Sequence, residues 1–579
     1  MAIEKINPIT RLDYPDPDVI RVDETYYMVS TTMYFMPGCE ILRSYDLVHW
    51  EHAAYVYDRL DSTPAQRLEG KENIYGQGMW AASLRFHDGV FYVCFVANDT
   101  HRTYLYTAKD ITGPWEKSLI PGFYHDNSIL FDDDGRIYIV YGNREIHITE
   151  LCIENGTLSP KEGGLEKVII RDRDDSPLGY EGAHFYKIDG RYYIFVIGIP
   201  GDTNKRTESC FVSDRPEGPY IGRKVMDDDR GYRNSGVAQG GIVQTKSGNW
   251  YSVLFQDSGA VGRIPVLVPI SWADVPASSL VDGFAAISSD SVRRDSEVFV
   301  PFPVFGNNGV IPDDFYIEDL RPGYRYTPLI SGDDFKNTDK ASYDSFGFKN
   351  CWQFSHDPDL SLITHDTSAG MVTITTNKLS SNLLQARNTI TQRTLFPCCG
   401  SSVTVDGSTL NDGDYAGLAV LESHYCFIAV TKRSGKYYLV MGKRELENSG
   451  IWGERHDDEP FDEVSCIPLE SPVVRLCSSI CFDHSLSDQS TGAEIMHAKN
   501  GGETYRLSYP SADDTARFFF STENGLPQRF GTDHKLCFKL DHFTGARFAL
   551  FLYSTLSIGG SASFSYFTYI FNLRSRNGA

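Results

Sequence analysis

Three acidic residues stand in local sequences that would hold a carboxylate in a fixed position. Asp16 lies between two prolines in the segment 14–18, Tyr-Pro-Asp-Pro-Asp, and each proline restricts the backbone around it. Asp126 lies in 125–128, His-Asp-Asn-Ser, and Glu181 lies between Gly-Tyr and Gly-Ala. A rigidly held carboxylate suits a general base, whereas small and partly apolar neighbours suit a general acid. A proline-rich strand start and an Asx turn are the structural alternatives for Asp16 and Asp126.

Other common catalytic patterns are missing from the sequence. It holds no GxSxG, HExxH or P-loop motif and no GxGxxG after a strand, and its 15 histidines show no ligand spacing. A further acidic run, Asp132-Asp133-Asp134-Gly135, is typical of a solvated hairpin turn. Carboxylate chemistry is therefore the catalytic hypothesis that the residues support best.

A short phrase recurs through the first half of the chain: a polar or glycine turn, a spacer and two aromatic or apolar residues. Its five copies end at Tyr27, Tyr92, Tyr138, Tyr193 and Tyr251. Each copy predicts a hairpin, and one hairpin cannot bury its apolar face alone. Radial stacking of five such units predicts a five-bladed β-propeller, with a β-sandwich as the alternative.

The heads of propeller blades surround one central axis. Asp16, Asp126 and Glu181 each stand at the head of a different predicted blade, so we expect their side chains to converge on one pocket. An acid and a base that face each other across a pocket are what hydrolysis of a glycosidic bond requires.

The second half of the chain has a different pattern. Residues 273–330 are mixed in character and contain several prolines, which predicts an extended connector. Alternating strands resume in segments such as 370–375 and 436–441, without the blade phrase. We expect an all-β chain of two domains: a five-bladed propeller over 1–325 and a β-sandwich over 326–579.

The charge of the chain argues against several kinds of partner. Its 54 Lys and Arg stand against 77 Asp and Glu, a formal net charge of −23, which disfavours nucleic acid and anionic membrane surfaces. No uninterrupted apolar run reaches the length of about 18 residues needed to span a membrane. The N-terminal segment, MAIEKINPITRLDYPDP, lacks the apolar stretch of a signal peptide. We expect a neutral substrate and a cytoplasmic protein, or a secreted one if a signal peptide has been removed.

Twelve cysteines in a chain of this length do not suggest a disulfide framework. Cys39, Cys94 and Cys210 lie inside apolar runs, which is typical of buried thiols that pack as small hydrophobic groups. The adjacent pair Cys398-Cys399 and the pair Cys477/Cys481 leave a metal or redox role as the alternative.

The first half of the chain, over about 1–275, resembles glycoside hydrolase family 43, five-bladed propeller enzymes that act on arabinose- and xylose-containing polysaccharides. The matching segments are 14–18, 26–32, 125–128, 180–184 and 262–265. The second half, through 351–354, 386–389 and 392–394, resembles the β-sandwich appended to many members, a concanavalin-like jelly roll.

The resemblance implies a role for each of these residues. It assigns Asp16 as the general base, Glu181 as the general acid, and Asp126 as the residue that orients Glu181 and raises its proton affinity. Arg263 matches an arginine that contacts the substrate.

Two further residues are candidates for sugar binding. Trp80 could stack against the terminal sugar, with a core tryptophan as the alternative. Gln239 stands where many relatives carry an axial histidine, sometimes beside a calcium ion. Gln239 can still form hydrogen bonds, but the sequence does not support a structural calcium ion.

The implied function is that of an exo-acting, inverting glycoside hydrolase. It would release terminal α-L-arabinofuranosyl or β-D-xylosyl residues from hemicelluloses such as arabinoxylan and xylan, from arabinan, or from their oligosaccharides. An endo-arabinanase and a non-catalytic carbohydrate-binding propeller are the alternatives. No cofactor or metal is expected to be required. The preferred pentose, the number of subunits and any contribution of the sandwich to the pocket stay open.

Overall fold

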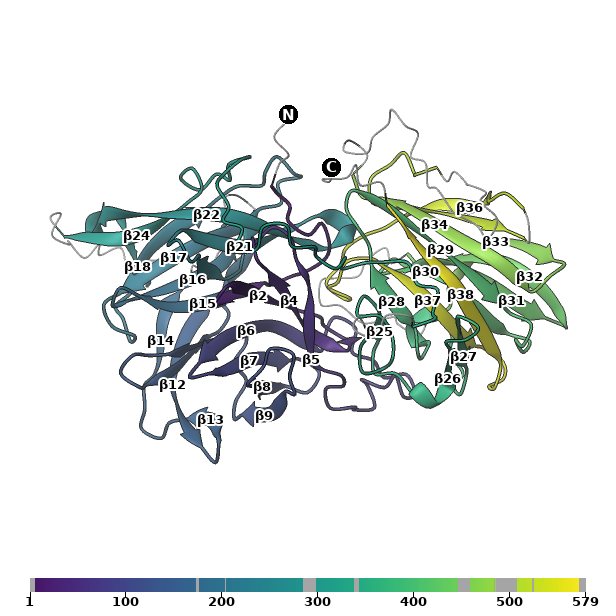
Figure 1. The fold of residues 1–579 in the computed structure, drawn as a ribbon, viewed down its shortest axis with the longest axis horizontal. Coiled ribbons are helices and arrows are strands. Elements are labelled where there is room, and N and C mark those ends of the chain that lie inside the picture. Colours follow the sequence, from purple (N-terminus) through teal and green to yellow (C-terminus); the bar gives the residue numbers. More distant parts are fainter. Residues whose placement is uncertain are drawn as a thin grey trace.

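The protein forms two β-structured bodies that lie side by side (Figure 1). The computed structural model describes residues 6–571 except 173–175, 202, 204, 285–297, 338–342, 446–458, 484, 486–507 and 523–524. The first part of the chain, purple to teal in Figure 1, forms a propeller, and the green to yellow part forms a sandwich. Within the described ranges, no helix has the length and apolar character needed to cross a membrane.

Five antiparallel sheets of four or five strands form the propeller blades. The first blade holds β1 (Asp18–Val22), β2 (Thr25–Ser30), β4 (Gly38–Ser44) and β5 (Glu51–Tyr57). The second holds β6 (Met79–His87), β7 (Val90–Ala97), β8 (Arg102–Ala108) and β9 (Glu116–Ile120). The third holds β10 (Ser128–Phe131), β11 (Ile137–Tyr141), β12 (Glu145–Glu154), β13 (Thr157–Pro160) and β14 (Glu166–Arg171).

The last two blades complete the ring. The fourth holds β15 (Leu178–Ile188), β16 (Arg191–Ile199), β17 (Thr207–Ser213), β18 (Ile221–Met226) and β23 (Val281–Asp282). The fifth holds β19 (Val237–Ala238), β20 (Ile242–Gln244), β21 (Trp250–Asp257), β22 (Arg263–Pro276) and β24 (Phe299–Phe305). The prediction of an all-β, five-bladed propeller is confirmed.

The recurring phrase forms the first turn of each blade. Between β6 and β7, His87 pairs with Val90, so Asp88 and Gly89 are the two turn residues, and both have positive φ (48° and 77°). Positive φ at both positions is the geometry of a type I′ hairpin turn, which matches the right-handed twist of the strands. The Asp-Gly pair therefore predicts this hairpin because both turn residues must adopt positive φ.

One turn prediction needs correction. Asp132 is not solvated, because its side chain is buried, accepts a hydrogen bond from the Tyr192 hydroxyl at 2.5 Å and pairs with Lys187. The ammonium group and the hydroxyl of the next blade compensate the buried charge. The acidic run thus joins two blades in addition to forming a turn.

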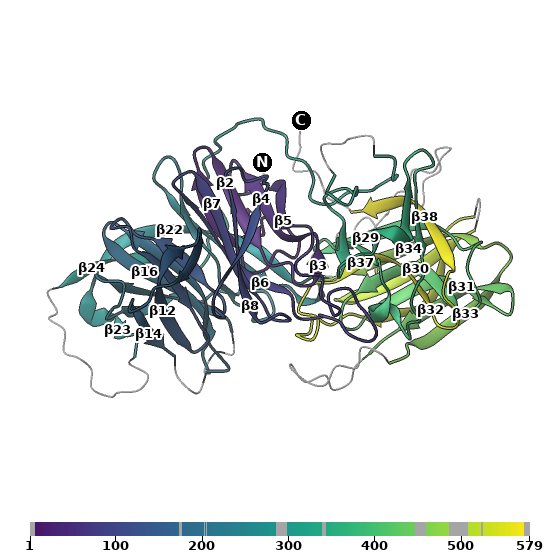
Figure 2. The same ribbon diagram turned by 90° about the horizontal axis from the view of Figure 1, so that it is seen from below.

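The sandwich consists of two packed sheets (Figures 1 and 2). One has the order β3 (Phe35–Met36), β25 (Gln353–Ser355), β28 (Ile390–Arg393), β37 (Arg547–Ser554), β30 (Asp414–Leu421), β31 (Cys426–Arg433), β32 (Lys436–Lys443) and β33 (Asp462–Leu469). The other has the order β26 (Ile363–Asp366), β27 (Met371–Thr375), β38 (Ser561–Ile570), β29 (Cys398–Asp406), β34 (Val473–Cys481), β35 (Thr515–Ser521) and β36 (Gln528–Lys535).

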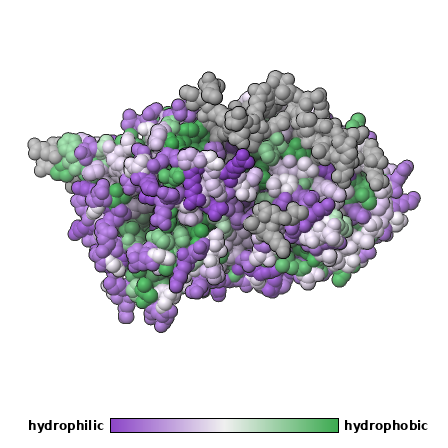
Figure 3. All heavy atoms as spheres, in the orientation of Figure 1, coloured by the Kyte–Doolittle hydropathy of each residue, from purple (hydrophilic) through white to green (hydrophobic). Residues whose placement is uncertain are grey.

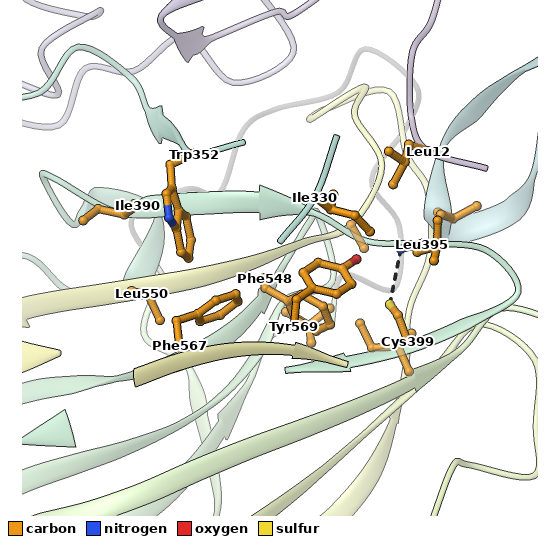
Figure 4. Packing of buried hydrophobic residues seen from close by; sticks show 14 of the residues in the cluster. Leu12, Ile330, Trp352, Ile390, Leu395, Cys399, Phe548, Leu550, Phe567 and Tyr569 are labelled. Carbon is orange, nitrogen blue, oxygen red and sulfur yellow. Dashed lines mark hydrogen bonds between the residues drawn. The ribbon is translucent and has the colours of Figure 1, made fainter. Parts of the chain in front are cut away.

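The two bodies share strands and core. The short strand β3 comes from the propeller part of the chain, yet Met36 pairs with Phe354 of the sandwich. Leu12 lies in the same buried cluster as the sandwich residues Leu395 and Tyr569 (Figure 4). The boundary predicted at 325/326 falls between β24 and β25, but the chain before it also builds part of the sandwich sheet.

A buried ion pair joins the bodies. Arg393 of the sandwich donates to Glu40 of the first blade at 2.7 Å and to the Asp13 carbonyl at 2.8 Å, and its guanidinium lies over the Tyr14 ring. Both charged side chains are almost fully buried.

The outer surface mixes hydrophilic and hydrophobic residues on the face shown in Figure 3.

We predict that Arg393→Met destabilises the protein by roughly 3–5 kcal/mol, because it leaves Glu40 buried without its cation. Arg433→Met is the matched control, since its pair with Glu463 is partly exposed and should contribute less than about 1 kcal/mol. Urea unfolding of both variants measures the difference. Equal stability of the two variants would contradict the assigned role of the ion pair.

Candidate active site

The three predicted catalytic carboxylates lie where inner strands of different blades begin. Asp16 stands two residues before β1, and Asp126 stands two residues before β10. Both have positive φ, 51° and 48°, which is uncommon outside glycine and costs energy that the surroundings must supply. Glu181 lies within β15 rather than ahead of the strand, at an irregularity where the pairing register shifts on both sides. Gly182 then takes φ 61°.

Hydrogen bonds between neighbouring blades fix the relative positions of these strand starts. The Ser83 hydroxyl accepts from the Ile129 amide at 3.1 Å, and the Ser128 hydroxyl accepts from the Phe185 amide at 2.9 Å. The two propeller segments that carry Asp126 and Glu181 are thus held by buried polar contacts as well as by apolar packing. Strained, well-supported backbone of this kind is typical of functional sites.

Asp16 is held at both carboxylate oxygens. Its Oδ1 accepts from Arg263 Nη1 at 2.7 Å and its Oδ2 accepts from the Thr31 hydroxyl at 2.7 Å. Burial raises the pKa of Asp16, whereas Arg263 and Thr31 oppose that rise. The arrangement fixes one orientation of a carboxylate and supports its ionised form, as the predicted base requires.

Asp126 and Glu181 lie together beside His125. Asp126 accepts from the Gly182 amide at 3.2 Å, and His125 Nε2 lies 3.8 Å from Asp126 and 3.7 Å from Glu181. Asn143 also donates to Glu181. Because Gly182 follows Glu181 directly, the bond to Asp126 fixes the backbone that carries the predicted acid.

The charged groups of the site shift the pKa values of Asp126 and His125. Burial, together with Glu181 and Asp16, raises the pKa of Asp126 to about 7, although His125 opposes this. Burial favours neutral His125, but the carboxylates of Asp126 and Glu181 outweigh it and raise the pKa of His125 to about 9. Near neutral pH Asp126 is therefore partly protonated, while His125 is cationic.

The same three side chains are the candidate metal site. The ligand atoms of His125, Asp126 and Glu181 lie within 4.8 Å of one another. However, a cation there would bind the carboxylate oxygen with which the predicted acid, Glu181, would have to transfer a proton. The predicted absence of a required metal stays a prediction.

The sandwich reaches the site through an aromatic residue that the sequence did not reveal. The Phe543 ring lies 4.3 Å from the Arg263 guanidinium carbon and 5.9 Å from the Trp80 ring. Trp80 is only partly buried, and the His125 ring lies 5.6 Å from its ring. Trp80 and Arg263 therefore lie beside the carboxylates, as predicted, and Phe543 covers both.

Asp13 holds this sandwich loop in place. Its two oxygens accept from the backbone amides of Arg263 at 2.7 Å and of Gly545 at 2.8 Å. One carboxylate therefore connects the strand that carries Arg263 with the loop that carries Phe543.

Gln239 packs against Gly182, the residue that follows Glu181. Its backbone amide donates to buried Glu208 at 2.7 Å, and it has φ 57°. A Cβ added to Gly182 would come within 2.6 Å of the Gln239 side chain, so the two residues pack closely. Gln239 supports the strand that carries Glu181, and its contact with a sugar stays a prediction.

We predict that Phe543→Ala lowers kcat/KM by roughly 10-fold, because the site loses one aromatic face and a cation–π contact. Phe571→Ala is the control, since Phe571 lies on the exposed C-terminal side of the sandwich and should leave the kinetics unchanged. Steady-state kinetics on an aryl pentoside measure both. An unchanged kcat/KM for Phe543→Ala would show that the sandwich is not part of the site.

Comparison with known proteins agrees with this geometry. Residues 6–275 match the family model of glycosyl hydrolases family 43, and residues 340–455 match that of the beta xylosidase C-terminal concanavalin A-like domain. The chain is 28% identical over 379 residues to a beta-xylosidase of Formosa agariphila, covering 61% of this chain and 58% of the relative. It is 29% identical over 318 residues to a non-reducing end alpha-L-arabinofuranosidase of Bacteroides ovatus, covering 51% and 56%.

A solved structure has a similar fold over nearly the whole chain. The bifunctional GH43-CE protein of Bacteroides eggerthii superposes with a TM-score of 0.78 at 33% identity, covering 98% of this chain and 64% of that one. The chain thus spans between half and two thirds of the length of these three proteins. The chain therefore carries a domain of glycosyl hydrolases family 43 over residues 6–275, followed by a beta xylosidase C-terminal concanavalin A-like domain over residues 340–455.

Proposed function

We propose that the protein is an exo-acting, inverting glycosidase that releases terminal arabinofuranosyl or xylosyl residues from pentose-containing oligo- or polysaccharides. The proposal rests on one observation: the carboxyl groups of the site lie in two different environments. Asp16 is paired with the Arg263 guanidinium, whereas burial, Glu181 and Asp16 raise the pKa of Asp126, which holds the backbone next to Glu181, to about 7. The beta-xylosidase and alpha-L-arabinofuranosidase named above support the choice of sugar.

In the proposed reaction one water molecule replaces the leaving group in a single step. Asp16 takes a proton from the water as its oxygen bonds to the anomeric carbon. The bond from that carbon to the glycosidic oxygen breaks, and Glu181 gives its proton to the departing oxygen. Solvent then reprotonates Glu181 and removes the proton from Asp16. No cofactor enters this scheme.

The remaining residues bind and orient. Arg263 holds Asp16 in position, and Asp126 holds the backbone next to Glu181. Trp80 offers an aromatic face to the terminal sugar, a common mode of sugar binding. Phe543 narrows the site from the sandwich side, which favours a chain end over the middle of a polysaccharide.

Two variants should respond differently to the leaving group. We predict that Glu181→Gln loses roughly 10²–10⁴-fold in kcat on xylobiose but much less on a dinitrophenyl pentoside, whose leaving group needs no proton. Asp16→Asn should lose activity on both substrates, since water must be activated in each case. An equal loss on both substrates for Glu181→Gln would contradict its role as the acid.

Asp126 should set the alkaline side of the pH profile. A negatively charged neighbour favours the protonated form of an acid, so Asp126→Asn should move the alkaline limb of kcat/KM to lower pH by about one unit. Asp99→Asn is the control, because Asp99 is also partly buried but bonds Gln66. An alkaline limb that stays in place would show that Asp126 only positions the backbone.

Two simpler assays address the alternatives. Hydrolysis should persist after treatment with EDTA, and added Mg²⁺ or Ca²⁺ should not raise it. Debranched arabinan or xylan should yield monosaccharide alone, whereas early release of longer oligosaccharides would identify endo action. Sugar binding without turnover would identify a binding propeller.

A further inference from the structure

Two cysteines of the sandwich face each other across adjacent strands. Cys398 is the first residue of β29 and Cys481 is the last residue of β34; they are direct partners in the antiparallel register. Their sulfur atoms lie 3.0 Å apart. β29 and β34 run side by side in both ribbon views (Figures 1 and 2).

The backbone at this position suits a disulfide. Directly opposite residues of antiparallel strands have Cα atoms about 4.5 or 5.5 Å apart, and both values fall within the range of about 4.4–6.8 Å found in disulfides. The sulfur atoms need to approach by only about 1 Å to reach bonding distance. No rearrangement of the strands is required.

The other cysteines nearby cannot compete for either partner. Cys399 points to the opposite face of its strand, where its sulfur accepts a hydrogen bond from the Leu395 amide at 3.3 Å (Figure 4). Cys477 shares the face of Cys481 but pairs with Ser402, and four residues along a strand separate it from Cys481 by about 13 Å. The geometry therefore selects one pair.

The pair stands between two contacts of the sandwich with the propeller. Just before Cys398, the Phe396 amide donates to the Arg11 carbonyl at 3.0 Å. Just after Cys481, the Phe482 carbonyl accepts from Arg233 at 2.8 Å. A disulfide here would covalently link the ends of β29 and β34, which lie next to these two contacts with the propeller.

We propose that Cys398 and Cys481 form a reversible redox pair that closes to a cross-strand disulfide under oxidising conditions and strengthens the joint between sandwich and propeller. The oxidant is a small-molecule disulfide such as oxidised glutathione. The Cys398 thiolate attacks it, releases one glutathione thiolate and forms a mixed disulfide. The Cys481 thiolate then attacks the Cys398 sulfur and displaces the second glutathione thiolate. Two protein thiols are oxidised, one glutathione disulfide is reduced to two thiols, and the two protons pass to them.

The rate of closure should depend on pH. The neighbouring Cys481 and burial raise the pKa of Cys398, and only the thiolate attacks a disulfide. Oxidation is therefore slow near neutral pH and faster in alkaline solution.

The test uses the full-length protein, kept in dithiothreitol or incubated with oxidised glutathione at pH 8.5. Free thiols are then alkylated in denaturant, and intact mass and peptide mapping follow. We expect the oxidised protein to lose two of its twelve thiols and to yield one linked peptide that contains Cys398 and Cys481. A linked peptide with other cysteines, or full alkylation of both residues, would overturn the proposal.

Thermal unfolding tests the consequence. The two cysteines are 83 positions apart, and linking them should raise the midpoint of unfolding of this 579-residue chain by about 3–5 °C. Dithiothreitol should reverse the shift, and Cys398→Ser should abolish it. Cys466→Ser, which removes an exposed thiol, should retain the shift. Linkage without any change in the midpoint would contradict the role at the joint.

Discussion

The central constraint on this protein is the repulsion among three carboxylates in one site, two of them buried and one partly buried. Asp16 and Asp126 are both nearly inaccessible to solvent, and Glu181 lies close enough to affect the pKa of each. Charges of the same sign, removed from water, cannot all remain ionised. Three features of the structure reduce this repulsion: Arg263 pairs with Asp16, His125 lies beside the other two carboxylates, and the pKa of Asp126 is raised to about 7. This division of a base from an acid is what the proposed chemistry uses.

The same constraint explains why the propeller alone does not complete the site. Arg263, which compensates Asp16, lies beneath the Phe543 ring of the sandwich. Asp13 binds both the strand of Arg263 and the loop of Phe543, and Arg393 reaches from the sandwich to Glu40. The sandwich therefore forms part of the candidate site, because Phe543 covers the buried Arg263 guanidinium.

Much of the fold could be predicted from the sequence because its signals are local. The turn phrase recurs once per blade, and three of its five copies contain an Asp-Gly pair such as 88–89, so it predicts both the hairpins and their number. The proline-flanked Asp16 and the resemblance of 125–128 and 180–184 likewise identify residues that the fold brings near one another. Trp80, Arg263 and Gln239 also lie at this site.

The rest depends on contacts between segments that are far apart in the chain. Nothing around Phe543 indicates that it covers Arg263, which lies 280 positions away. The burial of Asp132 depends on Lys187 and Tyr192 in the next blade, and its own sequence resembles an exposed turn. Strand β3 is too short to be recognised, yet it joins the sandwich sheet. The alternation of apolar and polar residues predicts which side chains of a strand face the core. The features named here depend instead on which distant segment packs against the strand.

The central claim is that Asp16 and Glu181 act in a single displacement at the anomeric carbon. Proton NMR of the first sugar released from a β-D-xyloside tests this most directly, before the product equilibrates in water. The account predicts that α-D-xylose appears first, because water attacks the face opposite the leaving group. Initial release of β-D-xylose would show that the configuration is retained and would contradict the assigned roles of both carboxylates.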